Sequence, residues 1–435
     1  MKKQEDPING LLDFLCESKT PFHAVAACEK RLTDAGFSPL FEGEEWKLEA
    51  GKGYYVTRNR SSILAFRMPA GEIRGFMIAA SHTDSPTFRI KHEPTAAAPG
   101  GLLRLNVEGY GGMLYSTWFD RPLSVAGRLT VKEGGAIVTK LVSVDRDLLV
   151  IPSVAIHLNR KANEGIAYNP ATDLQPLVGS EGGDLLAVVA DAAGVSRDAV
   201  LSYDLSLYDR TPGSTFGLAN EFVSSPRLDD LECVSGTLAG FLAAKTPKAG
   251  TVPLFCAFDN EETGSRTRQG ADSDFLASAV ARIARAAGKN PETLYPSSFL
   301  ASADNAHARH PNHPELSDGE NAPDLNRGIV IKHAASQKYA TDAISGAIFS
   351  EICRLADVPV QHFHNRSDIP GGSTLGNIST AHLPVNSVDI GLPQLAMHSA
   401  YETAGVRDYE ALLVSMTRFF SSKIVCDADG TYRVE

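Results

Sequence analysis

The sequence predicts an α/β fold in which a mixed sheet flanked by helices is interrupted by a β-rich insertion. A buried strand-like run occurs early, alternating segments between glycine-rich turns fill residues 88–215, and strands alternate with helices after residue 220. Strand–helix alternation favours a largely parallel sheet, whereas short alternating runs between turns favour antiparallel strands. We therefore expect one domain from residues 1–87 and 219–435, and a second from residues 88–218.

The first domain is expected to start with helical structure. Thr20 is a good N-cap, Pro21 suits the first helical position, and apolar residues follow at helical spacing until Gly36. The run Gly75–Ala80 is apolar on both faces, as a buried parallel strand should be. Polar residues begin where this strand stops, in the segment Ser81–Pro86.

The insertion is predicted to be a mostly β domain. Leu123–Val131 and Ile137–Val144 alternate in polarity, and the glycines Gly134-Gly135 between them predict a hairpin. A helix is expected at Asp184–Ala193, and Val200–Leu207 alternates again.

The C-terminal half returns to alternating elements. Short buried strands are expected at Thr251–Phe258, Ser298–Ala303, Gly328–Lys332 and Pro384–Ile390. Amphipathic helices are expected at Asp272–Ala287 and Asp408–Ser421.

The composition excludes several classes of protein. The chain has 435 residues, which suits two or three domains of about 150 residues. Its 41 Lys and Arg against 52 Asp and Glu leave a net charge of −11, which argues against nucleic-acid or anionic-membrane partners. No apolar run approaches the ~18 residues of a spanning helix, and Pro7 follows acidic residues where a signal peptide needs its apolar stretch. The six cysteines form no CxxC pair, so we expect a soluble, cytoplasmic protein.

Residues with catalytic chemistry follow the expected strands directly. They are His82 and Asp84 after the first strand, Asp259 to Glu262 after the second, Asp304 after the third, and His398 beyond the strand that ends at Ile390. Asp229 stands just before an apolar helical run. Because ligands bind at the carboxyl ends of strands in open parallel sheets, we expect these side chains to meet in one crevice.

This set of side chains suits a catalytic metal centre. Imidazole and carboxylate donors without thiolates favour zinc, manganese or cobalt. Two histidines and three carboxylates exceed the needs of one open tetrahedral ion and fit two ions that share a carboxylate. In the pair Glu261-Glu262, one carboxylate can ligate while the other acts as general base, and Asp84 is placed to orient His82. The implied reaction is metal-assisted hydrolysis of an amide.

Each of these residues also has a purely structural explanation when taken alone. A strand-end histidine is often simply hydrogen-bonded, and a Glu-Glu dipeptide is usually solvated charge. A polar loop explains His307, His310 and His313 as well as a metal does, and His362 and His364, which alternate on one strand face, are expected to be structural. The HExxH, GxxxxGK[ST], GxSxG and GxGxxG motifs are absent. The joint placement after successive strands therefore favours the metal centre.

At these residues the sequence resembles the aspartyl aminopeptidases, which are dizinc exopeptidases acting on acidic N-terminal residues. The similarity runs in order through nearly the whole chain. The matching blocks are Ser18–Val25, Ser81–Pro86, Tyr110–Gly112, Trp118–Arg121, Ile151–Leu158, Pro226–Asp229, Asp259–Ser265, Ser302–Asp304, Gly328–Lys332 and Gln394–Ser399. The resemblance implies a zinc-exopeptidase-like catalytic domain split by a β-rich dimerisation domain.

The resemblance also implies two zinc ions per subunit, for which cobalt or manganese can substitute. The implied ligands are His82, Asp304 and Asp229 for one ion, and Glu262, His398 and the shared Asp229 for the other. Glu261 would be the general base, and Asp84 would orient His82. The bridging role of Asp229 is known only from the resemblance.

Three further residues are implied to bind the substrate. Lys332 matches the family's substrate-binding lysine, Tyr339 matches a nearby tyrosine, and His157 matches a histidine that reaches the active site of a neighbouring subunit. Peptides with acidic N-termini are the substrates that the resemblance implies, because an acidic side chain entering a partly dry pocket needs a cation, here Lys332.

Family members typically assemble as tetrahedral dodecamers built from dimers, so the resemblance implies a homo-oligomer of this kind.

Two alternative functions remain open at this point. A neutral aminopeptidase, a carboxypeptidase or a deacylase on a similar scaffold would use the same dizinc chemistry without the role of Lys332. A catalytically silent, self-assembling shell protein would need none of it, although the ligands, base and orienting aspartate are all present in the sequence.

Overall fold

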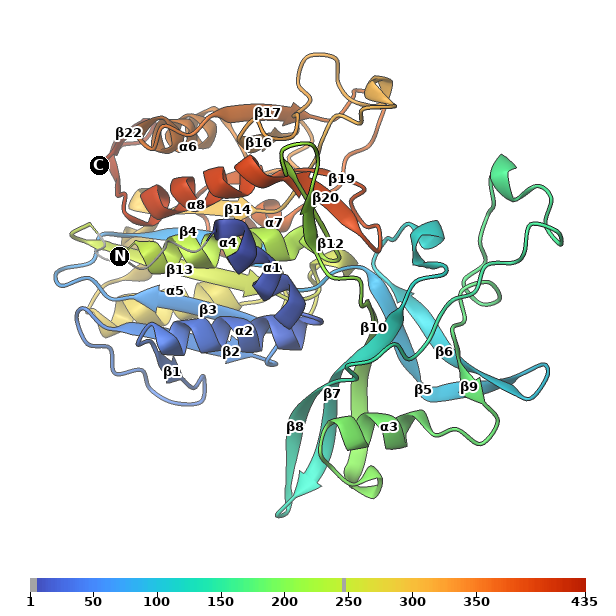
Figure 1. Cartoon of the computed structure of the whole chain (residues 1–435). Helices are drawn as coiled ribbons and strands as arrows, with labels where there is room; N and C mark the ends of the chain where they lie inside the picture. Colours follow the sequence, from blue (N-terminus) through green and yellow to red (C-terminus); the bar gives the residue numbers. More distant parts are fainter. Residues whose placement is uncertain (1–5, 245–247) are drawn as a thin grey trace.

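A computed structural model describes residues 6–244 and 248–435 (Figure 1). Residues 1–5, which contribute to the expectation that no signal peptide is present, lie outside the described part. Within the described residues, no helix has both the length and the apolar character needed to cross a membrane.

A nine-stranded mixed sheet forms the centre of the larger part of the molecule. Its strands are β1 (Ser38–Leu40), β2 (Gly53–Arg58), β3 (Ser62–Arg67), β4 (Gly75–His82), β13 (Thr251–Phe258), β14 (Phe299–Ala303), β16 (Ile329–His333), β17 (Val360–His364) and β18 (Asn386–Gly391). They lie in the order β1-β2-β3-β13-β4-β14-β18-β16-β17. The central strands β13, β4, β14 and β18 are parallel, so their carboxyl ends meet at one edge of the sheet. Antiparallel pairing of β2, β3 and β13, and of β16 with β18, makes the sheet mixed.

Helices cover both faces of this sheet. They are α1 (Pro7–Glu17), α2 (Pro21–Asp34), α4 (Leu228–Ala243), α5 (Phe275–Ala286), α6 (Ala343–Leu355), α7 (Leu375–His382) and α8 (Val406–Phe420). Alternate residues of β4 point to opposite faces: Met77 and Ala79 join the core under α1, α2, α4, α6 and α8, whereas Phe76 and Ile78 join the core under α5 and α7. A mixed sheet covered by helices on both faces confirms the predicted α/β class. β4 is also buried along its whole length, as expected.

A second sheet holds the six strands that follow β4 in the sequence. They are β5 (Thr87–Ala98), β6 (Leu102–Tyr110), β7 (Leu123–Glu133), β8 (Ala136–Ser143), β9 (Leu177–Ser180) and β10 (Val200–Asp209), in the order β8-β7-β10-β5-β6-β9. Every pair is antiparallel, and the expected Gly134-Gly135 turn joins β7 to β8. This sheet and helix α3 (Leu185–Ala192) stand beside the nine-stranded sheet (Figure 1). The domain boundaries at 87/88 and 218/219 stay a prediction.

A small five-stranded sheet, which the sequence did not predict, lies between these two parts. It consists of β11 (Ser214–Phe216), β12 (Phe222–Ser225), β15 (Ala306–His307), β19 (Pro393–Leu395) and β20 (Glu402–Gly405). Its strands have two to four residues, too short for a periodic pattern to be recognised. The chain ends in a hairpin of β21 (Ile424–Ala428) and β22 (Thr431–Val434).

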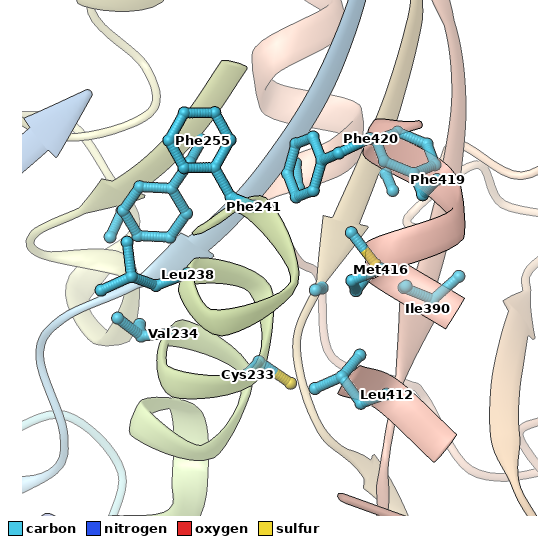
Figure 2. Close-up of a cluster of buried hydrophobic side chains, with 14 of the residues drawn as sticks. Cys233, Val234, Leu238, Phe241, Phe255, Ile390, Leu412, Met416, Phe419 and Phe420 are labelled. Atoms are coloured by element: carbon cyan, nitrogen blue, oxygen red, sulfur yellow. The ribbon is translucent and has the colours of Figure 1, made fainter. Parts of the chain in front are cut away.

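The helices α4 and α8 pack so closely that α4 needs glycine at the contact. Figure 2 shows the buried cluster between them, in which Phe241 of α4 lies beside Phe420 of α8 with ring centroids 5.3 Å apart. Gly240 faces Met416 in this contact, and a Cβ added to Gly240 would lie 2.6 Å from the Met416 Cβ and 2.9 Å from its carbonyl carbon. Because backbone atoms form one side of this contact, the two helices would have to move apart.

We predict that Gly240→Ala destabilises the protein although alanine is the better helix former. Overpacking against α8 should lower the free energy of unfolding by about 1–3 kcal/mol, measured by urea denaturation. The matched control is Gly10→Ala in α1, where no atom lies within 4 Å of the added Cβ. That change should raise the free energy of unfolding by up to about 1 kcal/mol. A stabilising Gly240→Ala would contradict the proposed reason for this glycine.

Candidate metal centre

The carboxyl edge of the nine-stranded sheet collects most of the residues expected at the site. His82 ends β4, Glu261 and Glu262 follow β13, and Asp304 follows β14. In the sheet β4 lies between β13 and β14, and His82 pairs in register with Phe258 at the end of β13. These strand ends therefore bring the side chains together, as the sequence predicted.

Two other residues reach the edge by different routes. Asp229 lies at the start of α4, where its own backbone is not yet helical. His398 was expected several residues beyond the strand ending at Ile390, and the intervening residues form β19 of the small sheet. His398 then adopts a positive φ of 66°, a conformation that non-glycine residues adopt only occasionally.

Asp229 stands between the two histidines. Its Oδ1 lies 3.5 Å from Nε2 of His82, and its Oδ2 lies 3.2 Å from Nε2 of His398. Asp304 Oδ1 lies 4.0 Å from the same nitrogen of His82, and Glu262 Oε1 lies 3.3 Å from that of His398. Two groups of side chains thus share Asp229, one with His82, Asp304 and Asp230 and one with Glu262 and His398. A third group consists of His82, Glu261 and Glu262.

The residues present fit a divalent metal centre. Among the described residues, the buried atoms Asp229 Oδ1 and Glu262 Oε1 have no hydrogen-bond partner. Buried polar atoms are almost always hydrogen-bonded, so these two oxygens indicate a missing ligand. The donors are imidazole nitrogens and carboxylate oxygens, which suit zinc in a catalytic site.

The charges around Asp229 also favour a bound cation. Asp229, Asp230, Glu261, Glu262 and Asp304 form a concentration of largely buried carboxylates. Burial, together with the negative charges of neighbouring carboxylates, raises the pKa of Glu261 well above its usual value. Burial raises the pKa of Glu262 to about 7. The two histidines and the Lys332 ammonium, 3.5 Å from Oδ2 of Asp304, compensate this charge only in part, whereas divalent ions would neutralise the carboxylates directly.

The histidines respond to the same negative charges. Burial alone would lower the pKa of His398, but its interactions with Asp229 and Glu262 raise it to about 11. The pKa of His82 is likewise raised despite burial, by Asp230 and Asp229. Both imidazole Nε2 atoms therefore face carboxylates that a cation would share with them.

Asp84 connects His82 to the Glu261-Glu262 turn. Nδ1 of His82 lies 3.0 Å from the main-chain oxygen of Asp84 and 3.4 Å from its carboxylate Oδ1. The carboxylate accepts hydrogen bonds from the main-chain N–H groups of Glu261 and Glu262 at 3.1 and 3.2 Å, and from the Tyr110 hydroxyl at 2.6 Å. The residue expected to orient His82 therefore contacts it through its backbone oxygen more closely than through its side chain.

Sequence reasoning missed two carboxylates that hold the candidate ligands. Glu402 is buried and accepts the N–H of His398 at 2.6 Å through Oε1 and the N–H of Asp229 at 3.0 Å through Oε2. Asp230 Oδ2 accepts the N–H of His82 at 3.0 Å. Both carboxylates accept hydrogen bonds from backbone N–H groups. Such contacts leave no spacing pattern in the sequence, so Glu402 could not be recognised from it.

The three expected substrate-binding residues lie in different surroundings. Lys332 is only 1% exposed, and its Nζ donates to the main-chain oxygen of Asp304 at 2.7 Å. The Tyr339 ring centroid lies 5.3 Å from the same Nζ. His157 is exposed in the connection between β8 and β9 and belongs to neither group around Asp229.

Comparisons with known proteins agree with this geometry. The family model described as "Aminopeptidase I zinc metalloprotease (M18)" matches residues 14–420. The chain is 47% identical to "Probable M18 family aminopeptidase 2" of Clostridium novyi over 422 residues, covering 94% of this chain and 97% of that protein.

Two solved structures are similar over almost the whole chain. The chain in the structure of the Ape4 and Nbr1 complex is 37% identical, with a TM-score of 0.92 over 96% of this chain and 86% of that one. The S. cerevisiae mApe1 dodecamer is 27% identical, with a TM-score of 0.85 over 96% of each chain.

We predict that Glu402→Ala weakens the centre without removing a metal-facing side chain. Two buried N–H groups would lose their acceptor, which should cost about 1–3 kcal/mol of unfolding free energy. Zinc affinity, measured by competition with a chromogenic chelator, should fall by about 10- to 100-fold because outer-shell contacts orient the ligands. Glu410→Ala on the exposed face of α8 is the control and should change neither quantity. Unchanged zinc affinity in Glu402→Ala would contradict this role.

Proposed function

The chain belongs to the M18 family of aminopeptidase zinc metalloproteases, and from that premise we propose that it removes N-terminal aspartate or glutamate from peptides. Family membership makes it a metal-dependent aminopeptidase, and the acidic specificity and two zinc ions per subunit are the proposal. The observation that carries the dinuclear centre is the position of Asp229, whose two oxygens face two different histidines.

We assign His82, Asp304 and Asp229 to one zinc ion and Glu262, His398 and Asp229 to the other. The short distances within each group and the partnerless oxygens of Asp229 and Glu262 support this assignment. A carboxylate that bridges two ions is the usual way in which co-catalytic sites hold them roughly 3.5–4 Å apart. Cobalt or manganese can replace zinc, because imidazole and carboxylate ligands accept all three.

Glu261 is the general base in this proposal. Zinc, when bound, supplies the Lewis acidity that polarises the scissile carbonyl and acidifies the attacking water. The Glu261 carboxylate accepts the water's proton and returns it to the amine that leaves. Its position in the group with His82 and Glu262 supports this role, as does the hydrogen bond from its N–H to Asp84. Asp84 orients both His82 and Glu261, since it contacts the His82 imidazole and accepts the N–H groups of the Glu261-Glu262 turn.

Lys332 provides the positive charge for an acidic side chain. Two of its ammonium protons have acceptors in the main-chain oxygens of Asp304 and Asn305, at 2.7 and 3.3 Å. An ammonium group has three donors, and the third can bind a substrate carboxylate, although the Nζ also lies 3.5 Å from Oδ2 of Asp304. Burial makes that interaction strong, because a charge-assisted hydrogen bond is little weakened away from water. The Tyr339 ring, whose centroid lies 5.3 Å from the Lys332 Nζ, would lie close to that carboxylate.

The protein is proposed to act as a homo-oligomer, with a dodecamer built from dimers as its form. The similarity to the S. cerevisiae mApe1 dodecamer supports this proposal. His157 is exposed in the long connection between β8 and β9, where it could contact the active site of an adjoining subunit. Dimerisation through the six-stranded sheet would then complete each substrate site.

The two alternative functions differ in which of these residues they need. A neutral aminopeptidase or a related exopeptidase or deacylase would keep the metal centre and leave Lys332 as a structural residue. A silent shell protein has no chemical need for the complete set of ligands, base and orienting aspartate. The complete set therefore favours an active enzyme.

We predict that Glu261→Gln keeps the metals but loses turnover. The amide cannot accept a proton, so kcat on an aspartyl anilide should fall by about 10²–10⁴-fold, while elemental analysis finds the zinc content of the parent protein. Asp229→Ala is the contrast, since it should lose both zinc and activity. Full activity in Glu261→Gln would show that another group is the base.

We predict that Lys332→Met changes the substrate preference of the enzyme. The loss of one charged hydrogen bond is worth about 1.5–3 kcal/mol, so kcat/KM for aspartyl and glutamyl anilides should fall by about 10- to 150-fold. Turnover of a leucyl anilide by the same preparation is the internal control and should change little. An equal loss on all three substrates would leave Lys332 a structural residue and favour the neutral aminopeptidase.

A further inference from the structure

Three histidines meet at the outer end of the nine-stranded sheet, and the proposed reaction uses none of them. His333 ends β16, and His362 and His364 lie on β17, the edge strand beside it. The strands are parallel, with His333 paired to His364 and Ile331 paired to His362. Residues paired across neighbouring strands share a face, as do residues two apart on one strand. All three imidazoles therefore project from the same face.

The distances between the rings are short. Nε2 of His333 lies 3.0 Å from Nδ1 of His362, and their ring centroids are 5.2 Å apart. The His364 ring is stacked on that of His333, with centroids 5.0 Å apart and an angle of 8° between the planes. The side chains contacted by the middle residue of β17, Phe363, belong to the opposite face: Tyr339 and His307.

The nitrogen separation matches the spacing of two donors on one metal ion. Two imidazole nitrogens at about 2.1 Å from an ion lie about 3.0–3.4 Å apart for bond angles between about 90° and 109°. An imidazole binds a metal ion through an unprotonated ring nitrogen.

The cluster is accessible, and its surroundings leave room for an ion. His362 and His364 are exposed, and His333 and His364 line an open cavity of about 490 Å³. Of the cations on that cavity, Arg366 forms a two-point ion pair with Asp368, and Lys338 donates to the main-chain oxygen of Gly371. The His364 ring is stacked on His333, so it becomes a third donor when this exposed side chain turns to another rotamer and directs a nitrogen towards the ion.

We propose that His333, His362 and His364 form an additional site for one divalent transition-metal ion. Three imidazoles without a carboxylate favour Cu²⁺, Ni²⁺ and Zn²⁺ over Mg²⁺, Ca²⁺ or Mn²⁺, and Cu²⁺ should bind most tightly. The ion joins the end of β16 to the edge strand β17, so it replaces the single hydrogen bond between His333 and His362 with stronger links. Water completes its coordination on the exposed side.

The site adjoins the residues assigned to substrate specificity. Lys332 precedes His333 directly, and Tyr339 follows at the end of the same segment, where its ring lies 6.3 Å from that of Phe363. An ion that fixes β16 against β17 therefore restricts the pocket that receives the acidic side chain. This effect on substrates rests on the proposed function, whereas binding of the ion does not.

Copper binding to the zinc-loaded protein tests the proposal without measuring peptide hydrolysis. The probe is Cu²⁺ alone, with copper and zinc both counted by elemental analysis after equilibrium dialysis. The parent protein should take up one copper that His362→Gln/His364→Gln does not, while both keep their zinc. The electron paramagnetic resonance spectrum of that copper should show nitrogen coupling from imidazole ligands, which the double variant lacks.

The control is the other exposed pair of neighbouring histidines in the described chain, His310 and His313. Their ring centroids are 5.3 Å apart, but Nδ1 of His310 accepts the N–H of Asn312 and Nδ1 of His313 contacts Glu315. His310→Gln/His313→Gln should therefore keep the extra copper and its spectrum. Equal copper uptake by His362→Gln/His364→Gln and the parent would overturn the proposal, as would copper that enters only as zinc leaves.

Discussion

The buried concentration of carboxylates at the end of the central strands is the constraint on which the rest of the structure depends. Asp229, Glu262 and Asp304 would repel one another in a metal-free interior, and removing such charges from water is costly. The fold offsets part of this repulsion with two histidines and with the buried ammonium of Lys332. A bound divalent cation would balance more of this charge, so metal binding would stabilise this edge of the sheet.

Backbone N–H groups position the carboxylates as much as side chains do. Asp84 accepts the N–H groups of Glu261 and Glu262, and Glu402 accepts those of Asp229 and His398. Asp84 therefore holds the turn that carries both glutamates, and Glu402 joins two chain segments that are distant in the sequence. The elements that supply the segments are also rigid: β4 and β13 are wholly buried, and α4 is held against α8 by a contact that excludes even a Cβ at Gly240.

Strong local patterns allowed much of the fold and site to be predicted. The apolar run Thr251–Phe258 matched its strand to the residue, and the other buried strands differed from the prediction by one or two residues at their ends. The polar residues after these runs led to His82, Glu262 and Asp304. The small sheet escaped prediction because strands as short as Pro393–Leu395 carry no period, and His398 depends on that sheet for its position. Glu402 was missed because it acts on backbone groups. Only the family resemblance pointed to Lys332, and its deep burial was not predicted, because lysine side chains are usually exposed.

The chain crosses between the two large sheets directly beside the candidate ligands. β4 ends at His82 and β5 begins at Thr87, and the return path from β10 passes through β12 into α4 at Asp229. The centre thus draws on positions from 82 to 398, and it exists only while strand ends, helix start and small sheet are all in place. A bound ion can consequently dissociate only when a strand end, the helix start or the small sheet moves away from it. The rate at which the metal exchanges with solution should then report how often this edge of the sheet opens, in the same way that amide exchange reports the opening of single hydrogen bonds.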